Sequence, residues 1–255
     1  MTTLPISLQL YTVRDALAAD WEGTLERVAE MGYVGVETAG FSYAPSTAAA
    51  VDKIHSLGLT ISGAHSGLPL GDAKDQALEM MDALGNDRII CAWVDPSNFM
   101  SIDAIKKLTD QFNEANSVAK SAGLSLGFHN HWFEYWNVDG RNGLEIMIAE
   151  GLDDDVFFEM DTYWTQTARA DVIEELERFG SRVPLIHVKD GPTGHASNMT
   201  AVGQGVMDFH SIIPAAKSAE WLVVELDRCD TDMMTAVKES IEYLTAEGLG
   251  RGRSN

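Results

Sequence analysis

Short apolar runs and amphipathic stretches alternate along the whole chain. The runs, rich in β-branched and aromatic residues, predict strands at 6–10, 34–37, 60–64, 88–92, 124–129, 156–161, 184–187 and 221–225. Stretches with helical spacing lie between them, among them 21–31, 46–57, 101–122 and 232–247, and each of these four is followed by a glycine. Glycine just past a helix is the expected stop signal. The alternation predicts strand–helix units and a parallel sheet.

The number of units decides between two architectures. Eight units in a chain of 255 residues favour a closed (β/α)8 TIM barrel. A doubly wound sheet is the alternative, but no GxGxxG motif follows the first run. Because no linker or shift in composition interrupts the pattern, we expect residues 1–255 to form a single domain. The tail 249–255, GLGRGRSN with its preceding glycine, is expected to be frayed.

Composition and charge narrow the function. The net charge is −21, from 39 acidic and 18 basic residues, which argues against nucleic acid and anionic membranes as partners. No apolar run reaches the length of a membrane span, and the N-terminus lacks the basic region of a signal peptide. The two cysteines form no CxxC motif. These features predict a cytoplasmic protein.

Charged side chains stand at or just past the ends of four apolar runs. They are Glu134, Asp161, His187 and Glu225. If the runs are barrel strands, these side chains meet at one mouth, where such barrels keep their active sites. Three carboxylates and one imidazole suit Mn²⁺, Mg²⁺, Co²⁺ or Zn²⁺, and a cation would relieve their mutual repulsion. Ordinary polar residues at strand ends are the alternative explanation.

The segment FHNHWFEYW is dense in groups that can do chemistry. His129 and His131 lie two residues apart and share a strand face, and Trp132 could form a wall against a sugar ring. A loop with surface histidines is the simpler alternative.

Further residues are candidates for contact with a substrate. Lys189, on the face of His187, could neutralise an oxyanion or could be salt-bridged. His65 ends the third run and could bind substrate or be structural, and Gln9 at the first run is a weaker candidate. Glu37 could bind a hydroxyl group or pair with a base at the rim.

Six motifs, in order along nearly the whole chain, carry a resemblance to a known family. ISLQLYTVRD, GYVGVE, GFHNHWFEY, HVKDG, AVGQGVMDF and VVELD resemble the sugar phosphate isomerase/epimerase family of xylose-isomerase-like barrels, related to endonuclease IV. The resemblance implies a (β/α)8 barrel with one divalent metal, Mn²⁺ first, held by Glu, Asp, His and a second Glu. Asp161, His187 and Glu225 match the last three positions. Many relatives have Glu where this chain has His129, so we assign Glu134 as the first ligand, with His129 or His131 as the alternative.

The family implies a divalent-metal-dependent isomerase or epimerase acting on a sugar or a related polyol ketone. A proton is abstracted beside the carbonyl and a metal-stabilised enediolate forms. Glu225 and Glu134 are the expected acid–base pair, with His131 as a further candidate acid.

Three other functions remain as alternatives. The first is a metal-dependent dehydratase or lyase on a keto-sugar, keto-glycoside or inosose, and the second is a non-catalytic barrel. An abasic-site endonuclease is disfavoured by the acidic charge. The expected partner is a small carbohydrate, and the chain could form a homo-oligomer.

Overall fold

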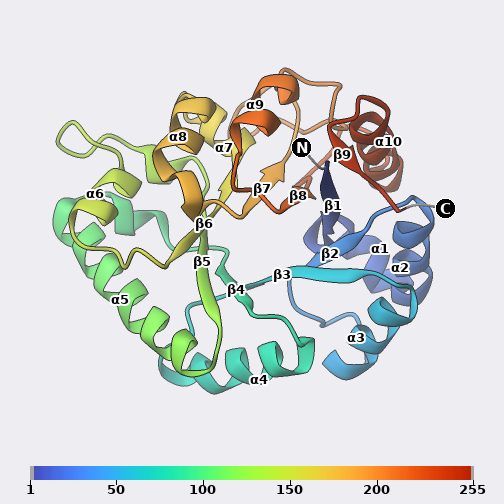
Figure 1. The fold of residues 1–255 in the computed structure, drawn as a ribbon, viewed down its shortest axis with the longest axis horizontal. Coiled ribbons are helices and arrows are strands. Elements are labelled where there is room, and N and C mark those ends of the chain that lie inside the picture. Colours follow the sequence, from blue (N-terminus) through green and yellow to red (C-terminus); the bar gives the residue numbers. More distant parts are fainter. Residues whose placement is uncertain (1–2, 254–255) are drawn as a thin grey trace.

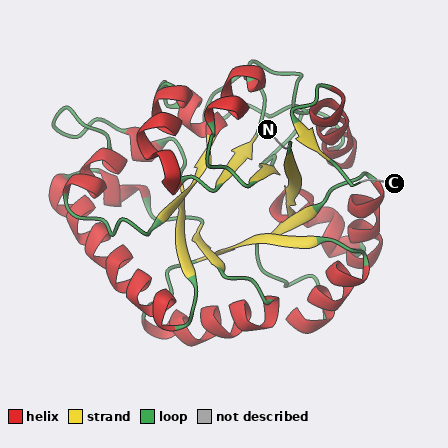
Figure 2. Cartoon of the chain, in the orientation of Figure 1, coloured by secondary structure: helices red, strands yellow, loops and turns green. Residues whose placement is uncertain are grey.

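Eight parallel strands close into a barrel in the computed structural model, which describes residues 3–253 (Figures 1 and 2). β1 pairs with both β2 and β8, which closes the ring, so the predicted (β/α)8 barrel is confirmed. The strands are β1 (Leu4–Gln9), β2 (Gly35–Thr38), β3 (Thr60–Ser66), β4 (Arg88–Cys91), β5 (Ser125–His129), β6 (Phe157–Asp161), β7 (Leu185–Val188) and β8 (Trp221–Val224).

Helices surround the barrel as an outer ring, which is plain in Figure 2. The long helix after β4 shows how the sequence sets the ends: the Ser101 hydroxyl accepts from the N–H of Ala104, and Gly123 just past the end has φ +74°. The helices are α1 (Arg14–Ala19), α2 (Trp21–Glu30), α3 (Thr47–Ser56), α4 (Lys74–Leu84), α5 (Ile102–Ser121), α6 (Gly143–Ala149), α7 (Thr162–Thr167), α8 (Val172–Phe179), α9 (Phe209–Ala215) and α10 (Met233–Ala246). Short 3₁₀ helices are η1 (Leu10–Val13), η2 (Gly71–Ala73), η3 (Pro96–Phe99), η4 (Phe133–Tyr135) and η5 (Gly180–Arg182).

The C-terminal tail is ordered as far as it is described, where fraying was expected. β9 (Gly250–Arg251) pairs in parallel with Leu4 and Pro5 of β1. The Arg253 guanidinium donates to the carbonyl of Leu57. A backbone ladder and an arginine bond therefore anchor residues that composition alone marks as a loose end; residues 254–255 lie outside the described part.

The barrel interior is apolar at its amino-terminal end. Ile90, Phe157, Leu185 and Val223 form a separate buried cluster inside the ring of strands. Gly127 faces this cluster, and a Cβ at that position would lie 2.3 Å from the Phe157 ring. The missing side chain therefore gives the ring its space, so the lower barrel is a packed plug.

The same strands turn polar toward their carboxyl ends. On β6 the residues that point into the barrel are Phe157, Glu159 and Asp161, and all three are buried. Along β7 and just beyond it they run from Leu185 through His187 to Lys189. Since strand side chains repeat with period two, β6 and β7 each contribute an apolar residue below and charged residues above. The fold thereby gathers charge at one mouth.

Among the helices in residues 3–253, none is both long and apolar enough to cross a membrane.

Candidate active site

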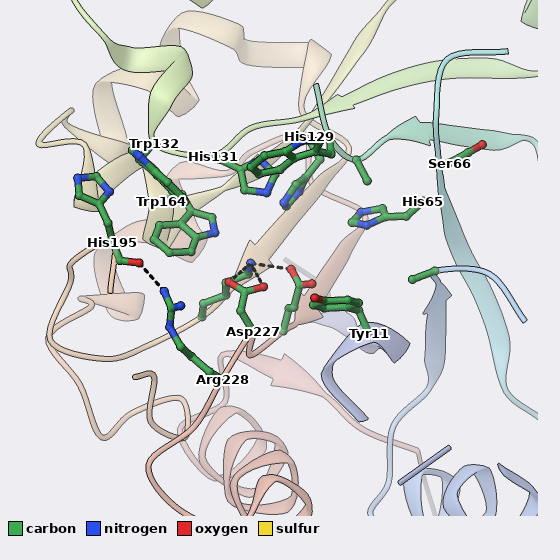
Figure 3. Close-up of a pocket in the computed structure, with 15 residues that line it drawn as sticks. Tyr11, His65, Ser66, His129, His131, Trp132, Trp164, His195, Asp227 and Arg228 are labelled. Atoms are coloured by element: carbon green, nitrogen blue, oxygen red, sulfur yellow. Dashed lines mark hydrogen bonds and ion pairs between the residues drawn. The ribbon is translucent and has the colours of Figure 1, made fainter. Parts of the chain in front are cut away.

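A cavity of about 550 Å³ opens at the carboxyl ends of the strands (Figure 3). Its polar lining includes His65, His129, His131, Lys189, Glu225 and Asp227. Its aromatic lining consists of Tyr11, Trp93, Trp132 and Trp164. The volume lies in the range usual for small-molecule sites.

Four buried side chains at the base of this cavity form what we call the mouth group: His129, Asp161, His187 and Glu225. One donor atom from each lies within 4.8 Å of the others, and all four residues are buried. His187 Nδ1 lies 2.8 Å from Glu225 Oε2, and His129 Nε2 lies 3.7 Å from Asp161 Oδ2. The carboxyl ends of β5, β6, β7 and β8 thus bring two imidazoles and two carboxylates to one point.

Local structure orients Asp161. Its Oδ1 accepts the N–H of Trp164 and caps α7, and its own N–H donates to the side chain of Asn130. Oδ2 has no well-angled hydrogen bond within the described residues, although the Lys189 ammonium is 2.9 Å away. Capping fixes one carboxylate oxygen and leaves the other aimed into the group.

Lys189 supplies the positive charge next to these carboxylates. Its buried ammonium lies 2.9 Å from Asp161 Oδ2, 2.7 Å from Glu225 Oε2 and 3.3 Å from Asp227 Oδ2. Burial lowers the pKa of Lys189, but the three carboxylates outweigh it and hold the pKa well above its usual value. Burial likewise raises the pKa of Glu225, but Lys189 and His187 outweigh it and hold the pKa well below normal. Lys189 and Glu225 are therefore both ionised at neutral pH.

His129 differs from His187 in its protonation. Burial, reinforced by the charges of His187 and His131, holds the pKa of His129 well below its usual value, so its ring is neutral. Burial lowers the pKa of His187 as well, but Glu159, Glu225 and Glu37 raise it well above normal. A neutral imidazole has a lone pair to offer a metal ion, and the lowered pKa leaves His129 in this form.

A second polar layer lies beneath the mouth group. Glu37 Oε2 accepts from the amide of Gln9 at 2.6 Å and lies 2.9 Å from His187 Nε2. Glu159 Oε2 lies 2.6 Å from His65 Nε2 and 3.1 Å from His187 Nε2. Burial lowers the pKa of His65, but Glu37 and Glu159 raise it to about 10. Both ring nitrogens of His187 therefore face carboxylates: Nε2 faces Glu37 and Glu159, and Nδ1 faces Glu225.

Glu134 lies outside the mouth group. It belongs to the 3₁₀ helix η4, which follows β5 after a turn, and its Oε2 accepts the backbone N–H of His131 at 2.8 Å. Its Oε1 lies 3.8 Å from His131 Nδ1. Burial raises its pKa. Because the Glu134 carboxylate folds back on its own turn, it contacts His131, which lines the cavity, and does not line the cavity itself. His129, the alternative ligand, belongs to the mouth group.

Aromatic side chains form the outer cavity wall. The rings of Trp132 and Trp164 have centroids 4.7 Å apart, and His195 lies 4.9 Å from Trp132. On the opposite side Tyr11 is 45% exposed, with the Arg14 guanidinium 4.1 Å from its ring centroid. Figure 3 shows these two sides facing each other across the charged residues. Such walls are suited to the apolar faces of a sugar or another ring.

Of the residues expected in the site, Asp161, His187, Glu225, His129, Lys189 and His65 converge, and Trp132 and His131 line the cavity. Gln9 lies below the cavity floor, bonded to Glu37. Sequence reasoning missed Glu159, Trp93, Trp164 and His195. Glu159 lies two residues before Asp161 on a buried strand, so strand periodicity could have placed it on the same face.

The donor set fits a divalent cation. Two nitrogen and two oxygen donors converge. One is a carboxylate oxygen with no well-angled hydrogen bond to any residue in the range 3–253, and another belongs to a neutral buried imidazole. Mn²⁺, Co²⁺ and Zn²⁺ accept such mixed ligands.

Comparisons with known proteins agree with the fold. Residues 25–247 match the sequence model of the xylose isomerase-like TIM barrel family. The chain therefore belongs to that family, and the resemblance seen in its motifs is confirmed.

Solved structures share the architecture at low identity. A sugar phosphate isomerase/epimerase from Parabacteroides distasonis has a TM-score of 0.81 at 23% identity, covering 98% of this chain and 96% of that one. The IOLI protein with a binding zinc atom has a TM-score of 0.72 at 16% identity, covering 96% and 98%. The probable 3-DHS dehydratase involved in petrobactin synthesis from Bacillus anthracis has a TM-score of 0.74 at 13% identity, covering 95% and 99%. A comparison with curated protein sequences finds no significant match.

Proposed function

We propose that this protein is a divalent-metal-dependent isomerase or epimerase acting on a sugar or a related polyol ketone. The observation that carries the proposal is the mouth group: two imidazoles and two carboxylates within 4.8 Å of one another, below a cavity with aromatic walls. Membership in the xylose isomerase-like family supports it. The names of the solved structures, which include isomerases and epimerases, agree with it.

Asp161, His187 and Glu225 would hold the metal ion, with His129 in the first position. Glu134 was assigned that position from the sequence; we now favour His129 because its neutral ring lies in the group. A divalent ion bound there would polarise the substrate carbonyl and stabilise the negative charge that develops on its oxygen. Mn²⁺ remains our first expectation, with Zn²⁺, Co²⁺ and Mg²⁺ as alternatives.

The residues of the chain would move the proton. His131 lines the cavity and is backed by the carboxylate of Glu134, so it is placed to give or take a proton on one side of the substrate. Glu225, which also lines the cavity, would act on the other side. Glu134 does not line the cavity, so we assign it a positioning role acting through His131.

Lys189 and the aromatic walls would bind the substrate. The Lys189 ammonium at the cavity wall would attract an oxyanion developing on the substrate. Trp132 and Trp164 would stack on one face of the sugar, and His65 would reach a hydroxyl group from the third strand. We keep the cytoplasm as the expected location and leave a homo-oligomer as a prediction.

A dehydratase or lyase is the second candidate. Such a reaction shares the proton abstraction and adds an acid that protonates the departing oxygen. Four histidines line the cavity, and the three that are not assigned to the metal ion, His65, His131 and His195, could supply that acid. Product analysis separates the two: an isomer or epimer retains all atoms of the substrate, whereas elimination releases water or an alcohol.

The test combines metal content with proton exchange. We expect purified protein to hold metal that is lost in Glu225→Gln and His187→Ala, and to exchange a substrate α-proton with D₂O in a panel of ketoses. His129→Ala should weaken metal binding and Glu134→Gln should not; the reverse result would restore Glu134 as the ligand. Full metal content in both Glu225→Gln and His187→Ala would contradict the site.

A further inference from the structure

A second cavity of about 410 Å³ adjoins the cavity at the mouth of the barrel. We call it the side cavity, and we call the cavity above the mouth group the main cavity. Tyr11 and Ala39 line both of them. The side cavity lies between η1 and α1 on one side and the loop that follows β2 on the other. The proposed function leaves this space without a ligand.

The size of the side cavity suits a separate chemical unit. Sites for small molecules usually measure about 300–1,000 Å³. The main cavity, at about 550 Å³, and the side cavity, at about 410 Å³, each fall in this range. A single ketose bound at the mouth group would occupy the main cavity and leave the side cavity empty. Size therefore favours a substrate made of two joined units.

Tyr11 forms the boundary that such a substrate would cross. Its backbone N–H donates to the side chain of Gln9, and its carbonyl accepts from Arg14, so its position is fixed. Its side chain is nevertheless exposed, which leaves the ring free to contact a ligand. Figure 3 shows Tyr11 across the main cavity from Trp132 and Trp164. A ligand that extends away from the two tryptophans therefore reaches Tyr11 and then the side cavity.

The lining of the side cavity combines apolar surface with hydroxyl groups. Leu10 and Leu17 are buried and supply the apolar part. The Tyr43 hydroxyl is buried and has no hydrogen-bond partner within residues 3–253, and Ser42 adds an exposed hydroxyl. A buried hydroxyl without a partner is costly, and a ligand hydroxyl would satisfy it. Sugar rings offer apolar faces and hydroxyl edges, so they match this lining.

Charge favours an uncharged ligand in the side cavity. Arg14 is the one charged side chain among the described residues that line it. Its guanidinium already donates to the carbonyl oxygens of Tyr11 and Asp227, at 2.8 and 2.9 Å. Glu225 and Asp227 line the adjoining main cavity, and the net charge of the chain is −21, so an anion would be repelled. The remaining N–H groups of Arg14 can donate to neutral hydroxyls.

We propose that the side cavity binds a second, uncharged sugar unit, so that the substrate is a glycosylated ketose rather than a free ketose or a sugar phosphate. The ketose unit would lie above the mouth group against Trp132. The second unit would lie beyond Tyr11, against Leu17 and Tyr43. This inference rests on the proposed function, because the mouth group defines the end of the substrate that reacts.

The test compares the affinities of ketoses with and without a second sugar. Isothermal titration calorimetry of the full-length protein with Mn²⁺ present is carried out with fructose and with lactulose, turanose and palatinose. These three disaccharides carry a second sugar on different hydroxyl groups of fructose. We expect at least one of them to bind about 10-fold or more tightly than fructose, because the second unit makes contacts of its own.

Two neighbouring alanines on α1 provide a variant and its matched control. Ala18 is exposed and lines the side cavity, whereas Ala19 is exposed and is not among its lining residues. Ala18→Trp places an indole in the side cavity and should abolish the preference for the disaccharide, and Ala19→Trp should keep it. Ser42→Trp blocks the side cavity from the other wall in case Ala18→Trp does not fold, with circular dichroism reporting the fold.

The outcomes separate this inference from the proposed function. If no disaccharide binds more tightly than fructose, or if the preference survives both Ala18→Trp and Ser42→Trp, the side cavity is not a sugar site. Tighter binding of fructose phosphate than of every disaccharide would overturn the uncharged ligand. The proposed function survives these results if the protein binds metal and exchanges a ketose α-proton. A disaccharide preference that Ala18→Trp abolishes, in a protein that binds no metal and exchanges no proton, would support the side cavity and contradict the proposed function.

Discussion

The two ends of the barrel interior are built from the same strands and behave as opposites. The amino-terminal end holds Ile90, Phe157, Leu185 and Val223, a dry apolar plug. The carboxyl-terminal end holds carboxylates, imidazoles and a buried ammonium. On β6 only one intervening residue separates Phe157 from Glu159. The comparison teaches that different layers of the same strand serve stability and chemistry. Mutations in the apolar layer should therefore lower stability, and mutations in the charged layer should lower activity.

The largest effect is expected at the charged end. Asp161→Asn removes a carboxylate from the mouth group while preserving its shape, so we expect substrate proton exchange to fall by about 1,000-fold or more, equivalent to roughly 4 kcal/mol of barrier. Exchange with D₂O, followed by NMR, measures this. The exposed Asp75→Asn is the control, and equal rates in both variants would contradict the assignment.

Mutations in the apolar plug should lower the free energy of unfolding instead of the activity. Phe157→Ala leaves a cavity beside Gly127 and should lower the free energy of unfolding by about 3–5 kcal/mol. Denaturant titration measures the loss, and Phe157→Leu should lose less. We expect the folded fraction of Phe157→Ala to keep its metal. A loss of metal at unchanged stability would show that the two layers are not separate.

A Lys189 variant tests how much this ammonium stabilises the charged end of the barrel when no metal is bound. Lys189→Met leaves Asp161 and Glu225 facing each other, so the metal-free protein should lose about 3 kcal/mol of stability. Adding Mn²⁺ should recover most of the loss because the ion replaces the missing charge. Thermal unfolding with chelator and with Mn²⁺ measures both. The exposed Lys238→Met should change stability by less than about 0.5 kcal/mol, and an equal loss in both lysine variants would show that the site charges do not matter.

A buried acid outside the barrel gives the smallest expected effect. Glu175 on α8 is buried, and burial, with nearby Glu174 and Asp171, raises its pKa to about 7. A raised folded-state pKa favours the protonated form, so its contribution is present below the unfolded pKa of about 4.3 and is lost as pH rises through 7. Glu175→Gln should therefore be more stable than wild type by about 1 kcal/mol at pH 8 and equal to it at pH 4.5.

The pH series has its own control. The exposed Glu177→Gln on the same helix should show no such difference between pH 4.5 and pH 8. If Glu175→Gln gained nothing at pH 8, Arg178, whose Nε lies 3.3 Å from Glu175 Oε1, would be compensating the charge fully.

The eight strands and the helices α2, α3, α5 and α10 could be predicted because their signals are local. Apolar runs, helix caps such as Ser101 and stop glycines such as Gly123 act within a few residues of themselves. The order of the tail could not be predicted, because it depends on pairing with β1 at the other end of the chain.

The residues of the candidate site likewise divide into those that the sequence could predict and one that it could not. Asp161, His187 and Glu225 could be placed because each ends an apolar run, and parallel strands bring such ends together. The choice between His129 and Glu134 could not be made, because η4 folds the Glu134 carboxylate back onto the His131 N–H. A turn of that kind leaves no periodic trace in the sequence.

By itself, then, the sequence determined the barrel, the end at which charge gathers and the residues that end each strand, since these follow from periodicity and chain order. Only the tertiary structure decided which charges face each other. The Lys189 contacts with Asp161 and Glu225, and the ring joining Glu37, His65, Glu159 and His187, depend on strand register and tilt across the barrel. Register sets distances between residues far apart in the chain, and distance decides whether buried charges repel, pair or hold an ion.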